Sequence, residues 1–130
     1  MPHLSGFILA MTLAAAPAPP LAFDCRIEGA AMLRPPMAEL AICERIRQGL
    51  ERGLRRRVLA SKNELLDKTN WIRAEVKFRR PGIASAYIIL SRNSKILKYP
   101  EISVSVMDRP LDSMAVDMLA DTIADHAAAH

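Results

Sequence analysis

Two apolar segments joined by a short turn constrain this chain more than any other feature of its sequence. Apolar and charged residues alternate in 71–78, and the apolar run in 83–91 is nearly continuous. Residues 79–82 between them end in Pro-Gly, a pair typical of turns. Alternation with a period of two indicates a strand with one buried face, whereas a continuous short apolar run indicates a strand buried in a sheet. The chain is therefore expected to form a sheet, with residues 83–91 near its centre.

Two further segments have the pattern of strands. Residues 23–28 alternate between apolar and charged side chains. Residues 96–107 are a third apolar run, which we expect to be interrupted at Pro100 because proline cannot donate a backbone hydrogen bond to a neighbouring strand. These two segments add strands before and after the central pair.

Two segments predict amphipathic helices. The first runs from residue 37 to about residue 61, and Gly49 and Gly53 lie on its apolar stripe, which we interpret as a close approach of this helix to the sheet. Its other stripe residues are Ile42, Cys43, Ile46, Leu50, Leu54 and Val58. The second helix is expected after Asp108, a suitable N-cap, with Pro110 near its first turn. The residues expected on its buried face are Leu111, Met114, Met118, Leu119, Thr122 and Ile123.

The predicted order of elements is β-α-β-β-β-α. The chain has 130 residues, which is enough for one domain of ordinary size and too few for two. Each strand needs its apolar face covered, and two helices on one side of the sheet provide that cover. We therefore expect an α+β fold, a two-layer sandwich with a mostly antiparallel sheet and both helices on one face.

The first 22 residues have the pattern of a secretory signal peptide. A short apolar run, 7–16, is followed by small residues and prolines, and no stretch approaches the roughly 18 apolar residues that a membrane-spanning helix needs. We place the end of the signal at Ala22, so that residues 23–130 form a single small domain. The expected location is periplasmic or secreted.

The two cysteines of the chain are expected to form a disulfide bond. Exported proteins usually pair their cysteines, and closing the loop between Cys25 and Cys43 would add roughly 3 kcal/mol of stability in the chain-entropy model. The spacing is not that of a CxxC redox or metal pair, and no histidine lies near either residue. A structural disulfide is the interpretation that we adopt.

An aromatic and apolar cluster predicts an interaction surface on the sheet. By alternation, Trp71, Tyr87 and Ile89 point to the face opposite the helices. Exposed apolar patches of a few hundred Å² usually mark a binding site. We expect this face to bind a protein partner or a second copy of the chain, unless a strand or loop of the same chain covers it.

The first helix is strongly basic. Arg52, Arg55 and Arg56 are candidates for binding an anionic component of the cell envelope. The simpler interpretation is a solvated helix face with ion pairs such as Glu51 with Arg55. The second helix is acidic, and its stripe is expected to face the basic helix either within one subunit or across an interface. The residues of that stripe are Asp117, Asp121 and Asp125.

The sequence lacks the signatures of common enzymes, among them HExxH, GxSxG, the P-loop and GxGxxG. Glu75 and Glu101 are the best candidates for a catalytic carboxylate pair, but any small sheet offers such a pair. We therefore expect no enzymatic activity and no cofactor. The leading hypothesis is an exported binding module for an envelope macromolecule or a protein partner.

Two alternatives remain open. His126 and His130 are spaced i, i+4, which on a helix places two imidazoles on one face and suits zinc or copper. Met114 and Met118 would add thioethers to such a site, although we expect them to fill the core. The second alternative is nucleic-acid binding by the basic helix. It applies only if the N-terminus is not an export signal.

Overall fold

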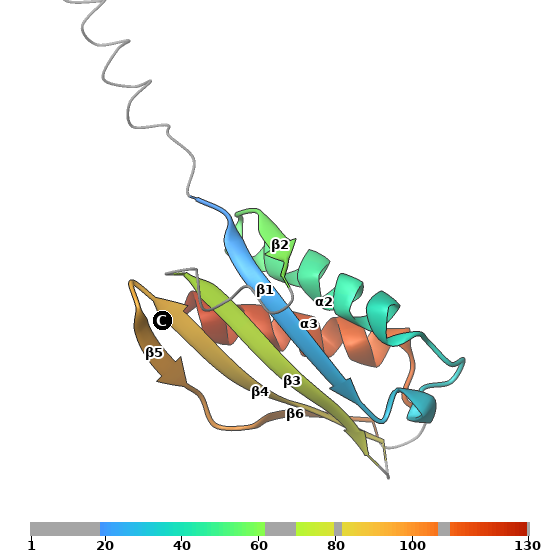
Figure 1. Ribbon diagram of the computed structural model, residues 1–130. Coiled ribbons are helices and arrows are strands. Elements are labelled where there is room, and N and C mark those ends of the chain that lie inside the picture. Colours follow the sequence, from blue (N-terminus) through green and yellow to red (C-terminus); the bar gives the residue numbers. More distant parts are fainter. Residues whose placement is uncertain (1–18, 62–69, 80–81, 107–109, 130) are drawn as a thin grey trace, which may run out of the picture.

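The computed structural model describes residues 19–61, 70–79, 82–106 and 110–129 (Figure 1). The strands form one sheet, and both helices lie side by side against one of its faces, so the expected α+β two-layer architecture is confirmed. In chain order the elements are β1 (Leu21–Glu28), the short 3-10 helix η1 (Ala30–Met32), α2 (Glu39–Leu54), β2 (Val58–Ala60), β3 (Trp71–Arg79), β4 (Ile83–Arg92), β5 (Lys95–Lys98), β6 (Ile102–Ser105) and α3 (Ser113–Ala128). In these ranges, no helix is long and apolar enough to span a membrane.

The sheet is mixed. Its strand order is β2-β1-β3-β4-β5, and β6 also pairs with β4. β1 runs parallel to β2 and to β3, whereas β4 is antiparallel to β3, β5 and β6. β4 is thus an interior strand with neighbours on both sides, as its continuous apolar run predicts, and the middle position belongs to β3. Pro100 lies between β5 and β6, where the interruption was expected.

The first helix is shorter than the sequence predicts. It ends at Leu54 because Arg55 adopts a left-handed conformation (φ 53°, ψ 43°), in which its N–H still donates to the carbonyl of Glu51. Val58 therefore belongs to β2, a three-residue strand that the sequence analysis missed, and it pairs with Leu21. The helical spacing of Val58 was misleading, since neither glycine nor proline marks the end of the helix.

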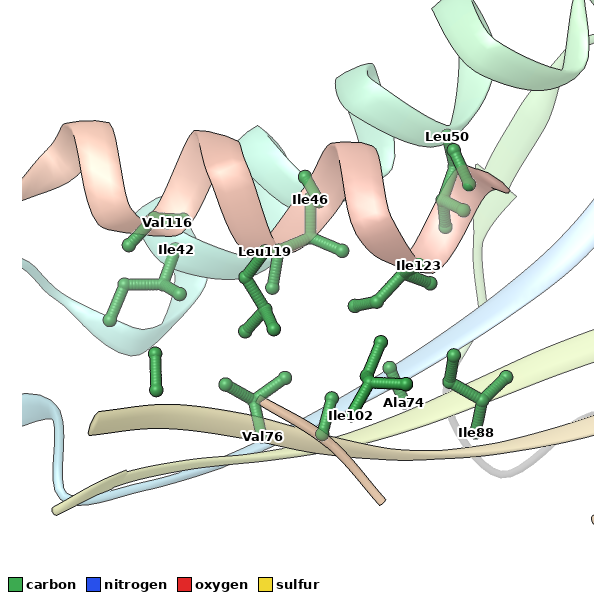
Figure 2. Close-up of a cluster of buried hydrophobic side chains, with 14 of the residues drawn as sticks. Ile42, Ile46, Leu50, Ala74, Val76, Ile88, Ile102, Val116, Leu119 and Ile123 are labelled. Atoms are coloured by element: carbon green, nitrogen blue, oxygen red, sulfur yellow. The ribbon is translucent and has the colours of Figure 1, made fainter. Parts of the chain in front are cut away.

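The core lies between the sheet and the two helices. Figure 2 shows α2 and α3 directing aliphatic side chains onto aliphatic side chains of the sheet. A fully buried side chain of this kind contributes about 1.5–3 kcal/mol. The labelled residues are Ile42, Ile46 and Leu50 of α2, Val116, Leu119 and Ile123 of α3, and Ala74, Val76, Ile88 and Ile102 of the sheet.

The two glycines of α2 face the other helix rather than the sheet, which corrects the interpretation made from the sequence. A Cβ atom on Gly49 would lie 2.7 Å from the Cβ of Ala120, and one on Gly53 would lie 2.5 Å from that of Ala124. Both distances are shorter than real side chains tolerate. Glycine opposite alanine therefore permits the close packing of α2 on α3.

The close packing of α2 on α3 also means that the buried face of α3 differs from the expected one. Met114 and Met118 are exposed, at 54% and 42%, although they were expected in the core. Asp112 caps the helix by accepting a hydrogen bond from the backbone N–H of Ala115, whereas Asp108 lies outside the described residues. Small side chains take the inward positions, and the buried residues of α3 are Ala115, Val116, Leu119, Ala120, Ile123, Ala124 and Ala127.

The predicted disulfide bond is present. Cys25 of β1 is bonded to Cys43 of α2, with their Cα atoms 5.8 Å apart. The bridge ties the second half of β1 to the first half of α2.

Candidate interaction surface on the open sheet face

The sheet face opposite the helices arranges its side chains in transverse rows, because the pairing of the strands is continuous across it. No helix or strand of the described ranges lies over this face (Figure 1). One row crosses five strands and is apolar except for a serine. In order it consists of Leu59, Ala22, Trp71, Ser91 and Ile96. The two ends of the row, on edge strands β2 and β5, are exposed: Leu59 at 44% and Ile96 at 57%.

The middle of the row is buried. Trp71 points to the open face, as alternation predicts, but only 7% of its surface is exposed. It packs with Ala22 and the half-buried Ile89, and the guanidinium carbon of Arg73 lies 5.7 Å from its ring centre. Tyr87, on the same face of β4, is 41% exposed. The structure thus packs Trp71 with Ile89, whereas Tyr87 lies further along β4, opposite Glu75. Of these three residues, only Tyr87 offers a large exposed surface.

Beyond the apolar row, the open face carries oppositely charged pairs between β1 and β3. Pairs of this kind across neighbouring strands stabilise a register, although exposed ones contribute only about 0–1 kcal/mol each. The pairs are Asp24–Arg73 at 2.8 Å, Glu28–Lys77 at 3.5 Å and Arg26–Glu75 at 4.0 Å. The apolar row is therefore bordered by a charged surface with both signs represented.

A second polar cluster lies around Glu101, just before β6. The hydroxyl of Tyr87 donates to one carboxylate oxygen at 2.8 Å, and Arg79 donates to the other at 2.5 Å. The hydrogen bond from Tyr87 is the main reason why the pKa of Glu101 is lowered, and the same contact raises the pKa of Tyr87. Glu101 is thus held by these two residues rather than combined with Glu75 into a carboxylate pair.

The charged face of α2 is used partly for packing within the subunit. Arg45 donates from Nε and Nη2 to the two carboxylate oxygens of Asp117, at 2.9 and 2.6 Å, and joins α2 to α3. This pair raises the pKa of Arg45. Asp121 and Asp125, which continue the acidic stripe, are exposed. The basic and acidic helices therefore meet within one subunit at Asp117.

Arg47 takes the carboxylate that was expected to pair with Arg55. Its Nη1 donates to Glu51 at 2.6 Å and to the carbonyl of Val58 at 2.9 Å, and its other two nitrogens donate to Glu44. These bonds raise the pKa of Arg47 and lower those of Glu44 and Glu51. The expected Glu51–Arg55 pair is not formed, because Arg55 has left the helical conformation.

The predicted basic cluster lies at the carboxyl end of α2. Arg52 and Arg55 are exposed, and no ion pair in the described ranges uses either of them. Arg56 is half-buried, and its Nη2 donates to the carbonyl of Pro19 at 2.6 Å. Two of the three predicted arginines are therefore accessible, whereas Arg56 helps to hold the segment that enters β1.

The predicted histidine pair falls only partly within the described residues. His126 is half-buried near the end of α3, and its Nδ1 lies 3.0 Å from the carbonyl oxygen of Thr122. His130 lies outside the described residues. Within the described part of the chain, no three or more His, Cys, Asp or Glu residues are grouped so as to hold a metal ion.

The two exposed ends of the apolar row were not predicted from the sequence. Leu59 was assigned to a helix, so its position on a sheet edge was not foreseen. Ile96 lies in a Lys-Ile-Leu-Lys strand, in which two adjacent apolar residues give no alternation that would assign Ile96 to the open face. Both residues lie on edge strands, which a single sequence does not identify.

Comparisons with known proteins give a fold and no family. No protein-family model and no curated protein matches the chain. Among solved structures, a point variant of the PelC dodecamer from Paraburkholderia phytofirmans superposes with a TM-score of 0.58 at 12% identity, covering 84% of this chain and 87% of that one. A second PelC dodecamer structure from the same organism gives a TM-score of 0.54 at 12% identity, covering 84% and 86%. At this identity, the likeness shows that the chain has the same α+β fold and nothing more.

Proposed function

We propose that this chain is an exported binding module that acts as a homo-oligomer and has no catalytic step of its own. The observation that carries the proposal is the exposed apolar residue at each edge of an otherwise well-packed sheet, Leu59 on β2 and Ile96 on β5. Apolar side chains at open sheet edges favour contact with another chain.

The character of the β5 edge supports a specific contact rather than aggregation. Lys95 and Lys98 flank Ile96 and Leu97, and lysines at an edge strand oppose nonspecific strand pairing. A short edge strand with charged ends can still bind a complementary surface of another chain. The PelC dodecamers have a similar fold and assemble from copies of it, which supports self-association as part of this proposal.

The disulfide bond supports the export part of the proposal. Disulfides persist in oxidising compartments and are rare in the cytosol. Cys25 and Cys43 are the only cysteines of the chain, and they are bonded to each other. The proposal therefore places the protein in the periplasm or outside the cell.

One preparation of the protein, expressed with its native N-terminus and recovered from the periplasm or medium, tests both parts. Export predicts removal of the N-terminal segment in the intact mass, and two thiols that alkylate only after reduction. Self-association predicts a sedimentation-equilibrium mass that is a multiple of the monomer. An unprocessed chain with free thiols would overturn the export part, and a monomer at all concentrations would overturn the oligomer.

The matched variants Ile96→Ser and Met118→Ser test the surface. Both replace an exposed apolar side chain, but Met118 is on α3, away from the sheet edge. Ile96→Ser should shift the sedimentation mass toward the monomer, since it removes the apolar side chain from the proposed contact. Met118→Ser should leave the mass unchanged. Equal behaviour of the two variants would count against the β5 edge.

A second candidate function rests on Arg52 and Arg55, which are exposed and outside the ion pairs of α2. An exported protein with such a cluster is suited to bind an anionic envelope component. This candidate is compatible with the first, because Arg52 lies at the end of α2 and Arg55 just after it, and neither lies on the sheet.

A further inference from the structure

In the described part of the chain, one edge of the sheet is paired over only part of its length. β2 pairs with the first part of β1, from Leu21 to Phe23, and the N–H of Ser61 donates to the carbonyl of Phe23 at 2.8 Å. β1 continues to Glu28 with β3 on its other side. Among the described strands, none pairs with this edge of β1 beyond Phe23.

The uncovered half of β1 presents backbone hydrogen-bonding groups. Backbone groups of successive strand residues point alternately to the two neighbouring strands. The N–H of Leu21 and the carbonyl of Phe23 point to the β2 side, so those of Cys25 and Ile27 point to the same side. The side chains of Cys25 and Ile27 contact the core on the helix face. This edge is thus ordered by the fold, and the described residues leave it without a paired strand, so that a further strand can be added there.

A groove runs between the uncovered edge and α2. Its volume is about 430 Å³, and the end of β2 borders it. Leu40 of α2, which is 71% exposed, supplies an apolar side chain. Glu39 and Glu44 supply two carboxylates on the same helix. Arg26 and Arg47 line it as well, and Arg47 binds Glu44. The groove therefore combines an apolar contact with the carboxylate of Glu39, beside strand backbone with which no described strand pairs.

We propose that this groove receives strand β5 of a second copy of the chain, which adds to β1 and extends the sheet from one subunit to the next. The inference rests on the proposed homo-oligomer and names its contact. β5 has four residues, close to the five of β1 beyond Phe23, from Asp24 to Glu28. Lys95 lies on the same face of β5 as Leu97, which packs on the helix side, so it complements the carboxylate of Glu39.

The direction of β5 also fits. β3 is parallel to β1, β4 is antiparallel to β3, and β5 is antiparallel to β4, so β5 runs parallel to β1. A head-to-tail repeat keeps strand directions, and β5 would therefore add parallel to β1 of the next copy. Such a contact uses two different surfaces of each subunit, and it generates a closed ring or an open filament.

The first test compares Leu40→Lys with Met118→Lys in the full, exported chain. Both variants place a lysine at an exposed apolar position of a helix, and only Leu40 lines the groove. Leu40→Lys should raise the dissociation constant of the assembly by about tenfold or more, because it removes the apolar contact and repels Lys95 of β5. Met118→Lys should leave it unchanged. Circular dichroism shows that each variant is folded.

A charge exchange tests the pairing itself. Lys95→Glu and Glu39→Lys should each weaken assembly, and the variant that carries both changes should recover most of it, because opposite charges face each other again. The assembly should also weaken as salt concentration rises. Recovery in the double variant identifies β5 as the occupant of the groove.

The possible results separate this inference from the function on which it rests. A wild-type chain that is monomeric throughout overturns the homo-oligomer and the β5 contact with it. An oligomer that tolerates Leu40→Lys and both charge changes overturns only the β5 contact. An oligomer that loses assembly in the single charge variants without recovery in the double variant also overturns it, because another segment must then occupy the groove.

Discussion

Arg47 shows how a single residue connects the helix layer to the sheet. It lies on α2, binds the carboxylates of Glu44 and Glu51, and also donates to the carbonyl of Val58 in β2. Glu51 in turn accepts a hydrogen bond from the N–H of Val58 at 3.3 Å. The carbonyl and the N–H of Val58 are thereby both held by side chains of α2. Arg47 and Glu51 together position the short strand at the edge of the sheet.

The sequence alone did not indicate which arginine Glu51 would choose. Arg47 and Arg55 are both four positions away from it, so helical spacing allows either pair. The choice is decided by the end of the helix, since the left-handed conformation of Arg55 removes it from the helical face. Predicting the pair therefore required the boundary of α2, and helix boundaries are poorly determined by periodicity.

Acid should weaken the attachment of β2 through Glu51. Its pKa is lowered from 4.5 by the hydrogen bond from Arg47, and next by that from the backbone of Val58. A lowered pKa in the folded state means that the contribution to stability is present above the ordinary value and is lost as pH falls through the folded value. As the pH is lowered below about 4.5, the urea concentration at the midpoint of unfolding should therefore decrease more steeply in the wild type than in Glu51→Gln.

A second variant separates this pair from the other carboxylates of the chain. Arg47→Gln removes the donor and should flatten the same part of the pH profile. Parallel profiles for the wild type, Glu51→Gln and Arg47→Gln would show that the pair makes no pH-dependent contribution to stability.

Among the elements, the strands with strong patterns were predicted correctly. Alternation in residues 71–78 and the continuous apolar run in 83–91 indicated the β3–β4 pair to within a residue at each end. The cysteine pair was also predicted, because the chain offers one possible bridge. β2 was missed since three residues carry too little pattern. The parallel pairing of β1 with both neighbours was missed for another reason: it depends on tertiary packing rather than on local sequence.

The packing of α2 on α3 makes a prediction about Gly49. Alanine normally stabilises a helix by about 1 kcal/mol relative to glycine. Here the new Cβ would lie 2.7 Å from the Cβ of Ala120, and overpacking of this kind costs about 1–3 kcal/mol. Gly49→Ala should therefore lower the free energy of unfolding by about 1 kcal/mol, measured by chemical denaturation.

A double-mutant cycle identifies the cause. In the Ala120→Gly background the methyl group that Gly49→Ala would meet is absent, so the same substitution should become neutral or stabilising. Stabilisation by Gly49→Ala in the wild-type background would mean that the helices separate readily, contrary to a close glycine–alanine contact.

At the scale of the whole molecule, the start of β1 bears on how the chain is processed. Leu21 and Ala22 are buried and pair with Val58 and Leu59 of β2. A mature chain beginning at Phe23 would lose these two strand residues and two of the three residue pairs that join β2 to β1. The intact mass proposed above distinguishes such a chain from one that keeps Leu21.

The charge of the molecule is distributed unevenly, and this leads to the last prediction. The chain has a formal net charge of +4, and the exposed Arg52 and Arg55 lie on the same helix end, beside Arg56, which contacts Pro19. Basic residues near an anionic bilayer contribute about 1 kcal/mol each. The variant with Arg52→Gln and Arg55→Gln should therefore bind vesicles of anionic phospholipid about ten- to thirtyfold more weakly than the wild type in a sedimentation assay at low salt.

Net charge alone would produce a similar trend, so the control removes two positive charges elsewhere. Arg26→Gln with Lys77→Gln lowers the charge equally, at exposed or half-buried positions on the open sheet face. A local site predicts that this control binds nearly as well as the wild type, and that vesicles of zwitterionic lipid bind none of the three proteins. Equal loss in both double variants would show that attraction depends on total charge and that Arg52 and Arg55 form no specific site.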